Sequence, residues 1–448
     1  MKTTLKQTIA LLCTLVLLFG LCACSSKTAE PAEAASPSGT GSGTAALPTA
    51  EPAPEPAPEM EPTPSYAPSA EEPMPPVEAE SASLLAPGAA ADAAADTGEA
   101  PGIPEARTDQ AEAFVLTAAE WNDNENWPFF TNLVNSGKLT FPSYGVDPRG
   151  RVKVTLTDDA GTPLPGETVK LQTGDAIVWE AKTDKNGVAF LFHDPDAAPT
   201  HVLLEGEDGR YPLEIPEGGD AQNPGQMRPA DELTIVRSPL AAKQEELQVM
   251  FIVDTTGSMG DELAYLQKDF NAIAEDAGSD GVRYSVNFYR DEGDEYVTRC
   301  NPFTADIGEV HSLINAEYAD GGGDTPEAVA EILTETMAGD AGWSDSAAKL
   351  AFLIFDAPPH YGREQALVAA VRAAAAKGVR VVPVVASNAD RETELFGRAL
   401  AICTGGTYVF LTDDSGVGDE HLEPIVGDCE VELLHDVIVR IINENKVG

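Results

Sequence analysis

Apolar and polar positions alternate with a period of two from residue 149 to about residue 215, as in the segment 152–156. Turn signals such as Asn186-Gly187 separate the alternating runs. Several short strands at this spacing are typical of a small antiparallel β-sandwich. We therefore expect one over residues 149–240.

From residue 246 the pattern changes to continuous apolar runs that alternate with amphipathic stretches. The runs read as strands buried on both faces, at 247–253, 284–289, 350–355, 379–385 and 408–411. The stretches predict helices, at 261–276, 309–316, 326–337, 364–377, 392–401 and 431–443. This alternation predicts an α/β domain with a doubly wound, mostly parallel sheet over residues 246–446.

Residues 111–148 are rich in aromatic side chains, among them Trp121, Trp127, Phe129 and Phe130. So many large rings are not expected to remain in water, so this segment should pack against another part of the chain. Residues 25–110 are instead rich in Ala, Pro, Glu and Ser, with few large apolar side chains. Because burial could not offset the entropy of ordering them, we expect a disordered stalk.

The first 24 residues read as a targeting segment, since Lys2 and Lys6 precede an apolar run too short to span a bilayer comfortably. The run ends in Leu21-Cys22-Ala23-Cys24, which resembles the lipobox of bacterial lipoproteins. The resemblance implies that Cys24 is lipidated, becomes the mature N-terminus and anchors the protein to the extracytoplasmic face of the cell membrane. The alternative is an ordinary secretory peptide.

The chain has 448 residues, with 28 Lys and Arg against 74 Asp and Glu, and a formal net charge of −46. Phosphate would repel such a chain, and this argues against nucleic acid as a partner. Beyond the targeting segment lie three cysteines, Cys300, Cys403 and Cys429. An odd number leaves at least one without an intramolecular partner, and spacing alone does not establish a Cys403–Cys429 bridge.

Oxygen-bearing side chains gather where the predicted strands end. The first strand is followed by Asp254-Thr255-Thr256-Gly257-Ser258, a later loop reads Gly-Gly-Gly-Asp-Thr-Pro-Glu over 321–327, and another strand ends at Asp356. Ligands of open α/β sheets bind outside the carboxyl ends of the strands. Carboxylates and hydroxyls without nitrogen or sulfur suit Mg²⁺, with Mn²⁺ or Ca²⁺ as alternatives.

The three segments DTTGS, GGGDTPE and LIFDAPPH resemble the motifs of von Willebrand factor type A domains, notably the hemicentin-like branch. The resemblance implies a metal-ion-dependent adhesion site whose ligands are Asp254, Thr256, Ser258, Thr325 and Asp356, with Asp324 as the alternative to Thr325. It also implies a protein ligand that completes the ion with an Asp or Glu carboxylate. Separately, the segments GTPLPGETVKL and TDKNGVAFL resemble transthyretin-like or carboxypeptidase-regulatory-like β-modules.

Other interpretations of the same residues stay open. The DTTGS loop alone is a common helix cap, and the site could have degenerated to a structural role. A serine hydrolase would use Ser258, Asp356 and one of His360, His421 or His435. Against it, Thr256 replaces the glycine that permits a nucleophile elbow. We expect Arg290 to neutralise the acidic rim and His360 to be a lone surface histidine.

Together these features predict a surface lipoprotein with a disordered stalk, a β-sandwich and a von Willebrand A-like domain that binds a protein through a divalent cation. We expect no enzymatic activity.

Overall fold

The computed structural model describes residues 116–140, 144–197, 199–206, 209–213, 231–241, 243–323, 325–413 and 422–447. All of them belong to one compact unit, Ala100–Gly448. The predicted targeting segment with Cys24, the predicted stalk, Asp324 and His421 lie outside the described residues. No helix in the described ranges is both long enough and apolar enough to cross a membrane.

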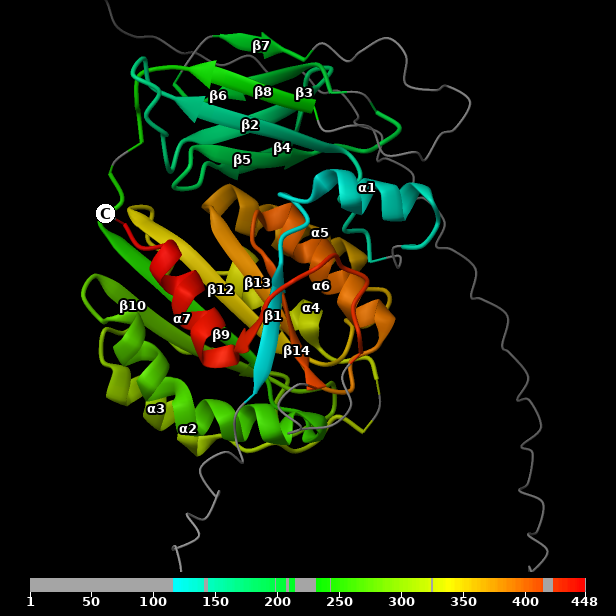
Figure 1. Ribbon diagram of the computed structural model, residues 1–448, viewed down its shortest axis with the longest axis vertical. Coiled ribbons are helices and arrows are strands. Elements are labelled where there is room, and N and C mark those ends of the chain that lie inside the picture. The colour runs from blue at the N-terminus through cyan, green and yellow to red at the C-terminus, as the bar shows by residue number, and fades with distance from the viewer. Residues whose placement is uncertain are drawn as a thin grey trace, which may run out of the picture. The chain divides into compact units, whose positions relative to one another are not determined.

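The core of the unit is an eight-stranded sheet with the order β11-β10-β9-β12-β13-β14-β1-β15 (Figure 1). Adjacent strands from β10 to β14 pair in parallel, whereas β11 and β1 pair antiparallel to their neighbours. This confirms the predicted α/β class with a large, mostly parallel sheet. The strands are β1 Thr117–Trp121, β9 Glu246–Asp254, β10 Val282–Tyr289, β11 Thr298–Arg299, β12 Ala347–Phe355, β13 Val379–Val385, β14 Tyr408–Thr412 and β15 Val431–Leu433.

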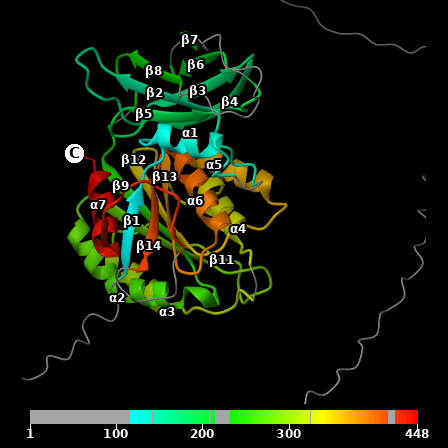
Figure 2. The ribbon, with the colours of Figure 1, turned by 45° about the vertical axis from the view of Figure 1, so that its right-hand side comes forward.

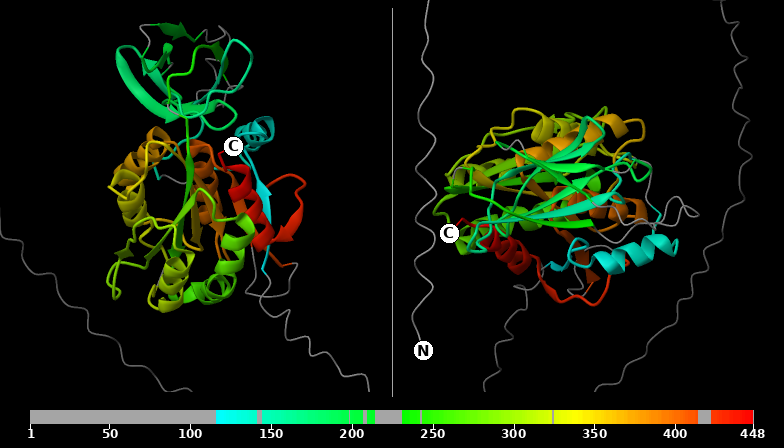
Figure 3. Two further views of the ribbon diagram at one scale, coloured as in Figure 1. Left: turned by 90° about the vertical axis from the view of Figure 1, so that its left-hand side faces the viewer. Right: turned by 90° about the horizontal axis from the view of Figure 1, so that it is seen from above.

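Helices cover both faces of this sheet (Figure 3). One face packs against α2 Gly260–Ala277, α3 Ile307–Ala316 and α7 Leu434–Glu444. The other face packs against α4 Val329–Leu333, the π-helical turn η2 Thr334–Ala338, α5 Glu364–Lys377 and α6 Arg391–Thr404. Burial on both faces explains why residues 249–253 of β9 and 381–385 of β13 are all apolar.

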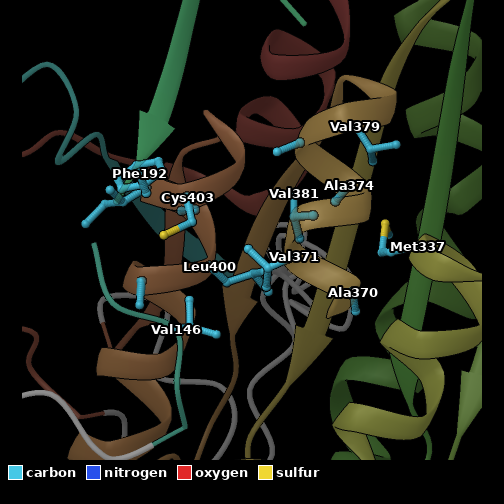
Figure 4. Close-up of a cluster of buried hydrophobic side chains, with 14 of the residues drawn as sticks. Val146, Phe192, Met337, Ala370, Val371, Ala374, Val379, Val381, Leu400 and Cys403 are labelled. Carbon is cyan, nitrogen blue, oxygen red and sulfur yellow. The ribbon is translucent and has the colours of Figure 1, made fainter. Parts of the chain in front are cut away.

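The alanine-rich helix α5 shows how the sequence sets these elements locally. Val371 and Ala374 of α5 pack in one cluster with Val379 and Val381 of β13 (Figure 4). Gly378 ends the helix with φ at +75°, a left-handed conformation that glycine adopts without a steric penalty. The chain can therefore turn directly from α5 into β13.

Strand β1 comes from the aromatic-rich segment and extends the sheet beside β14 (Figure 2). Its alternate residues bury on opposite faces of the sheet, Ala118 with one core and Ala119 and Trp121 with the other. The expected packing of the segment is confirmed, because Trp121, Trp127 and Phe130 are buried. Its role as a strand of the α/β sheet was not predicted.

A buried ion pair fixes the chain after β1 to helix α6. The Arg398 guanidinium donates from Nη2 to Asp123 Oδ1 at 2.7 Å and from Nε to Asp123 Oδ2 at 2.8 Å. Both side chains are almost fully buried. Such a fork-to-fork pair is geometrically specific, so it sets the position of this segment as well as binding it.

Residues 151–236 form two smaller sheets, a three-stranded sheet with the order β5-β2-β8 and a four-stranded sheet with the order β4-β3-β6-β7. Their pairs are antiparallel except for β2 and β8, which run parallel and so differ from the expected antiparallel module. β8 was not predicted. The strands are β2 Arg151–Thr157, β3 Thr168–Thr173, β4 Ala176–Lys182, β5 Val188–Phe192, β6 His201–Leu204, β7 Arg210–Pro212 and β8 Asp231–Val236, and helix α1 spans Trp127–Asn135.

The small sheets pack against the amino-terminal edge of the large sheet. A Cβ atom added at Gly405, just before β14, would lie 3.4 Å from the ring of Phe190. The Arg372 guanidinium lies 5.6 Å from the ring centroid of Trp179. The carboxyl edge of the large sheet, where the candidate site lies, is the opposite edge.

One local prediction was wrong, and one open question is answered. Residues 431–433 were expected to begin a helix, but they form β15, which pairs with β1. The sequence left a Cys403–Cys429 bridge open, and in the structure both cysteines are free, Cys403 buried and Cys429 exposed. Cys300 is also a free, exposed cysteine.

Candidate functional site

The candidate site lies where the strand order of the large sheet reverses. From β9 the chain proceeds outward through β10 and β11, and it then returns to β12 on the other side of β9. Parallel pairing places Val253 opposite Ile354. Asp254 and Asp356, which follow these two residues closely, therefore lie at the same edge. Such a topological switch point is the usual binding crevice of an open α/β sheet.

Asp254 organises the first loop. Its Oδ1 atom accepts hydrogen bonds from the Thr256 backbone N–H at 2.9 Å and from Thr256 Oγ1 at 2.8 Å. Its Oδ2 atom is buried and has no hydrogen-bond partner. The Tyr289 hydroxyl lies beside Asp254 and interacts with it electrostatically, but no hydrogen bond of normal geometry joins them. One oxygen of Asp254 thus shapes the loop while the other remains available.

Ser258 and Asp356 join the first loop, residues 254–258, to the third loop, which begins at Asp356 after β12. The Ser258 hydroxyl lies 3.4 Å from Thr256 Oγ1, and it is close enough to the Asp356 carboxyl to lower the pKa of that acid. Asp356 is buried, and its Oδ1 atom has no hydrogen-bond partner. The structure therefore brings four of the predicted ligands together: Asp254, Thr256, Ser258 and Asp356.

The glycine loop closes over the first loop. Gly257 donates its backbone N–H to Gly321 O at 3.1 Å. Gly322 has φ at +58°, and a Cβ atom added there would lie 2.6 Å from Thr256 Cβ, so only glycine fits. Thr325 is exposed two residues beyond Gly323, and the adjacent Asp324 is outside the described residues. The choice between Thr325 and Asp324 as ligand stays a prediction.

Glu327, which was not predicted as a site residue, is buried between the second and third loops. Its backbone N–H donates to Pro358 O at 3.0 Å, and it forms an isolated β-bridge with Pro359. Its Oε2 atom is buried without a hydrogen-bond partner. It is the last residue of the GGGDTPE segment, and its inward direction depends on the pairing of its backbone with Pro358 and Pro359, for which the sequence carries no local signal.

Burial and repulsion between neighbouring acids disfavour the ionised forms of the carboxyl groups at this site. Burial, and then repulsion from Asp356, raises the pKa of Asp254 to about 7. Burial also raises the pKa of Asp356, although the nearby Ser258 hydroxyl opposes the shift. For Glu327, burial and then repulsion from Asp254 raise the pKa to about 9. A positive charge at this edge would relieve all three.

Arg290 and His360 each pair with an acid of the loop after β10. Arg290 is buried, donates to Tyr318 O at 2.7 Å, contacts the rings of Tyr296 and Tyr318, and lies 3.6 Å from Glu295 Oε2, which agrees with its expected neutralising role. His360 is half-buried, with Nε2 2.5 Å from Asp291 Oδ1. The expectation of a lone histidine was wrong, because His360 ties the third loop to the loop after β10.

The residues for a serine hydrolase do not assemble around Ser258 in the part of the chain that the structure describes. His360 is bonded to Asp291, whereas His435 of α7 lies between Asp269 and Asp276 of α2. The hydroxyl of Ser258 instead has Thr256 and Asp356 as its neighbours.

Carboxylate and hydroxyl oxygens with unsatisfied buried atoms fit a hard divalent cation. Among the described residues of the predicted ligand set, Asp254 and Asp356 are the two acids. The other members carry hydroxyls. Within the described ranges, no group of three or more His, Cys, Asp and Glu side chains has an arrangement that would hold a metal ion. A cation here would therefore depend on the hydroxyls of Thr256 and Ser258 as well as on the acids.

A parallel sheet whose switch point carries an Asp-x-Thr-x-Ser loop, a glycine-rich loop and a further acid defines a von Willebrand factor type A domain. Residues 248–420 match the family model of the von Willebrand factor type A domain, so the chain contains such a domain.

Among curated proteins, the chain is similar to an ariadne-like RING finger protein of Acanthamoeba polyphaga mimivirus. The two are 26% identical over 214 residues, which cover 43% of this chain and 20% of the viral protein. The chain thus spans about a fifth of the length of that relative.

Proposed function

We propose that this protein binds a protein partner through a divalent cation held at the carboxyl edge of the large sheet. Asp254, Thr256, Ser258 and Asp356 would hold the ion, together with Thr325 or Asp324. A bound divalent cation supplies a Lewis-acid position that attracts an oxygen of the partner, an Asp or Glu carboxylate. The likeness to von Willebrand A domains supports the coarser part of this proposal, a role in protein interaction.

One observation carries the proposal: two acids from separate loops each keep a buried oxygen without a hydrogen bond. These atoms are Asp254 Oδ2 and Asp356 Oδ1. Leaving a buried charged oxygen unsatisfied is costly, and a bound ion is one of the explanations for such a group in a native protein. A cation would satisfy both oxygens at once.

The surface near the site suits a protein ligand. Tyr318 precedes the glycine loop, Tyr361 follows His360, and both side chains are exposed. Tyrosine is enriched at protein interfaces because it offers an apolar ring and a hydroxyl in one rigid side chain. We also propose that Cys24 is lipidated, which would hold the protein at the extracytoplasmic face of the membrane.

The test is the thermal stability of the chelator-treated protein with and without millimolar Mg²⁺ or Ca²⁺. A ligand that binds only the folded state raises the melting temperature, and at about 100 times its Kd it contributes about 2.7 kcal/mol. We expect this increase in the wild type and in Asp320→Ala, which removes an exposed acid beside the glycine loop. Asp254→Ala and Asp356→Ala should abolish it. An increase that survives in both variants contradicts the proposed site.

The competing hydrolase makes a different prediction. A fluorophosphonate should label Ser258 whether or not a chelator is present if the protein is a serine hydrolase. We expect no such labelling, since binding without catalysis needs no activated serine. Stoichiometric labelling that Ser258→Ala removes would overturn the binding proposal.

A further inference from the structure

The turn at residues 291–294, in the loop after β10, contacts both the glycine loop and the third loop. Asp294 Oδ2 accepts hydrogen bonds from the Asp291 backbone N–H at 3.0 Å and from the Gly322 backbone N–H at 2.9 Å. Asp291 Oδ1 lies 2.5 Å from His360 Nε2, which belongs to the third loop. None of these residues is in the predicted ligand set. The turn therefore connects two loops of the candidate site without supplying a predicted ligand itself.

The Asp294 carboxylate fits closely against the backbone of the glycine loop. Gly321 has φ at +83°, and a Cβ atom added there would overlap the Asp294 carboxylate. Glycine at this position leaves the room that the carboxylate needs to reach the N–H of the next residue, Gly322. Asp294 is half-buried, so this contact lies partly out of solvent.

The glycine loop is joined in turn to the first loop. A Cβ atom added at Gly322 would lie 2.6 Å from Thr256 Cβ, so the backbone of Gly322 lies against this side chain. Gly257 also donates its N–H to Gly321 O at 3.1 Å. Thr256 is a predicted ligand, and its Oγ1 donates to Asp254 Oδ1 at 2.8 Å. The carboxylate of the turn is therefore two contacts away from a predicted ligand.

Resting on the cation site proposed above, we propose that Asp294 is a positioning residue whose two hydrogen bonds hold the glycine loop against the first loop. The glycine loop leads towards Thr325, another predicted ligand, so its position sets the distance between ligands on the two loops. Hydrogen-bond partners behind metal ligands orient them, and the loss of one lowers metal affinity by about 10- to 100-fold. Asp294 acts on the ion through these loops and does not contact it.

The experiment is calorimetric titration of Mg²⁺, and separately of Ca²⁺, into the chelator-stripped full chain at a temperature at which every variant is folded. The variants are Asp294→Ala and Asp294→Asn, and Asp320→Ala is the matched control. Asp320 also lies next to the glycine loop, but its exposed carboxylate bonds no other described residue. We expect Asp294→Ala to raise the Kd by about tenfold or more, and Asp320→Ala to stay within about twofold of the wild type.

The asparagine variant separates the hydrogen bonds of Asp294 from its charge. Asparagine keeps an oxygen that accepts both hydrogen bonds but loses the charge. Asp294→Asn should therefore bind the cation within about twofold of the Asp320→Ala control. If Asp294→Asn binds as weakly as Asp294→Ala, the charge is what matters and the inference is overturned. A wild-type Kd in Asp294→Ala overturns it as well.

Asp294→Glu keeps the inference testable if Asp294→Ala does not fold. The longer side chain retains the charge, but Gly321 leaves no room for a further methylene, so the carboxylate is displaced. We expect at least about threefold weaker binding, and a wild-type Kd would contradict the positioning role. If Asp254→Ala abolishes binding while the Asp294 variants bind normally, only this inference fails. If Asp254→Ala binds normally as well, the proposed function fails.

Discussion

Asp254 has two separable tasks at the scale of a single residue. Oδ1 accepts two hydrogen bonds from Thr256, whereas Oδ2 is buried without a partner. An asparagine side chain can keep the acceptor oxygen that shapes the loop while it loses the charge. The substitution Asp254→Asn therefore separates loop structure from cation binding.

We predict that Asp254→Asn stabilises the cation-free protein at alkaline pH. The pKa of Asp254 is raised to about 7, above the value of 3.8 for an unperturbed side chain, so the folded state holds this proton more tightly than the unfolded state does. The contribution to stability is therefore greatest at acidic pH and falls as the pH rises from about 4 to about 7. At about pH 8 the asparagine variant should be more stable than the wild type by on the order of 2 kcal/mol.

Urea unfolding at about pH 5 and about pH 8, with chelator present, measures this difference. The gain should appear at the higher pH and shrink at the lower one. Saturating cation should reverse the order of stability, since it binds the wild type and not the variant. An equal pH dependence in wild type and Asp254→Asn would contradict the assigned shift.

The sequence sufficed to locate Asp254, Thr256, Ser258 and Asp356, because a strand end fixes where its next few residues lie. It did not identify Glu327. That side chain follows a loop, and its inward direction depends on the pairing of its backbone with Pro358 and Pro359, which are more than thirty residues away in the chain. A long-range contact of this kind leaves no local pattern.

At the scale of elements, the predicted helices and strands agree best with the observed ones where the element is buried. The strand predicted at 379–385 and the helix predicted at 364–377 coincide with β13 and α5, because both have continuous core contacts and Gly378 marks the boundary between them. Short edge strands were missed or misread. β1 has only five residues, and β15 is three residues that run directly into α7, so neither shows a recognisable period.

Helix α7 is attached to α2 by a histidine placed between two acids. His435 Nδ1 lies 2.8 Å from Asp269 Oδ2, and Nε2 lies 3.0 Å from Asp276 Oδ2. Burial lowers the pKa of His435, but the hydrogen bonds and charges of the two aspartates outweigh it and raise the pKa above 6.5. The contact is therefore strongest when His435 is protonated.

We predict that His435→Gln lowers stability at acidic pH more than at alkaline pH. A raised histidine pKa contributes stability that is present in full below the unfolded value and lost as the pH rises through the folded value. The expected loss is ~1 kcal/mol at about pH 6, reduced because Asp276 is largely exposed, and close to zero at about pH 9. Thermal melts at the two pH values measure it.

His311→Gln is the control for this prediction. His311 lies on α3, and its partners are the Gln267 carbonyl and the amides of Asn271 and Asn315 instead of carboxylates. An effect of His435→Gln that is the same at both pH values would show that the two aspartates do not bind a protonated histidine.

At the scale of the whole molecule, the α/β domain is completed by residues that precede the small sheets in the chain. β1 adds to the edge of the sheet beside β14, and Asp123 binds Arg398 of α6. Sequence reasoning separated these parts because composition changes sharply between them, yet the fold joins them through contacts about 275 to 300 residues apart. Local composition carries no information about such pairing.

We predict that Asp123→Ala lowers the free energy of unfolding by ~3 kcal/mol, because it leaves the buried Arg398 guanidinium with only part of its partners. Glu232→Ala is the matched control, since Glu232 forms an exposed ion pair with Lys153 at 3.5 Å, and such pairs contribute less than ~1 kcal/mol. Urea denaturation of both variants measures the difference. Equal losses would mean that the buried pair does not fasten β1 to α6.

The antiparallel course of β1 has a practical consequence for attaching the protein to a surface. Thr117 pairs with Thr412 at the carboxyl edge, so the chain enters the domain on the side of the candidate site. Lys446 lies at the other edge, beside the end of α2 at Ala277. A biosensor chip coupled through the C-terminal residues would therefore leave the binding edge facing the flowing analyte, whereas coupling just before Leu116 would turn it towards the matrix.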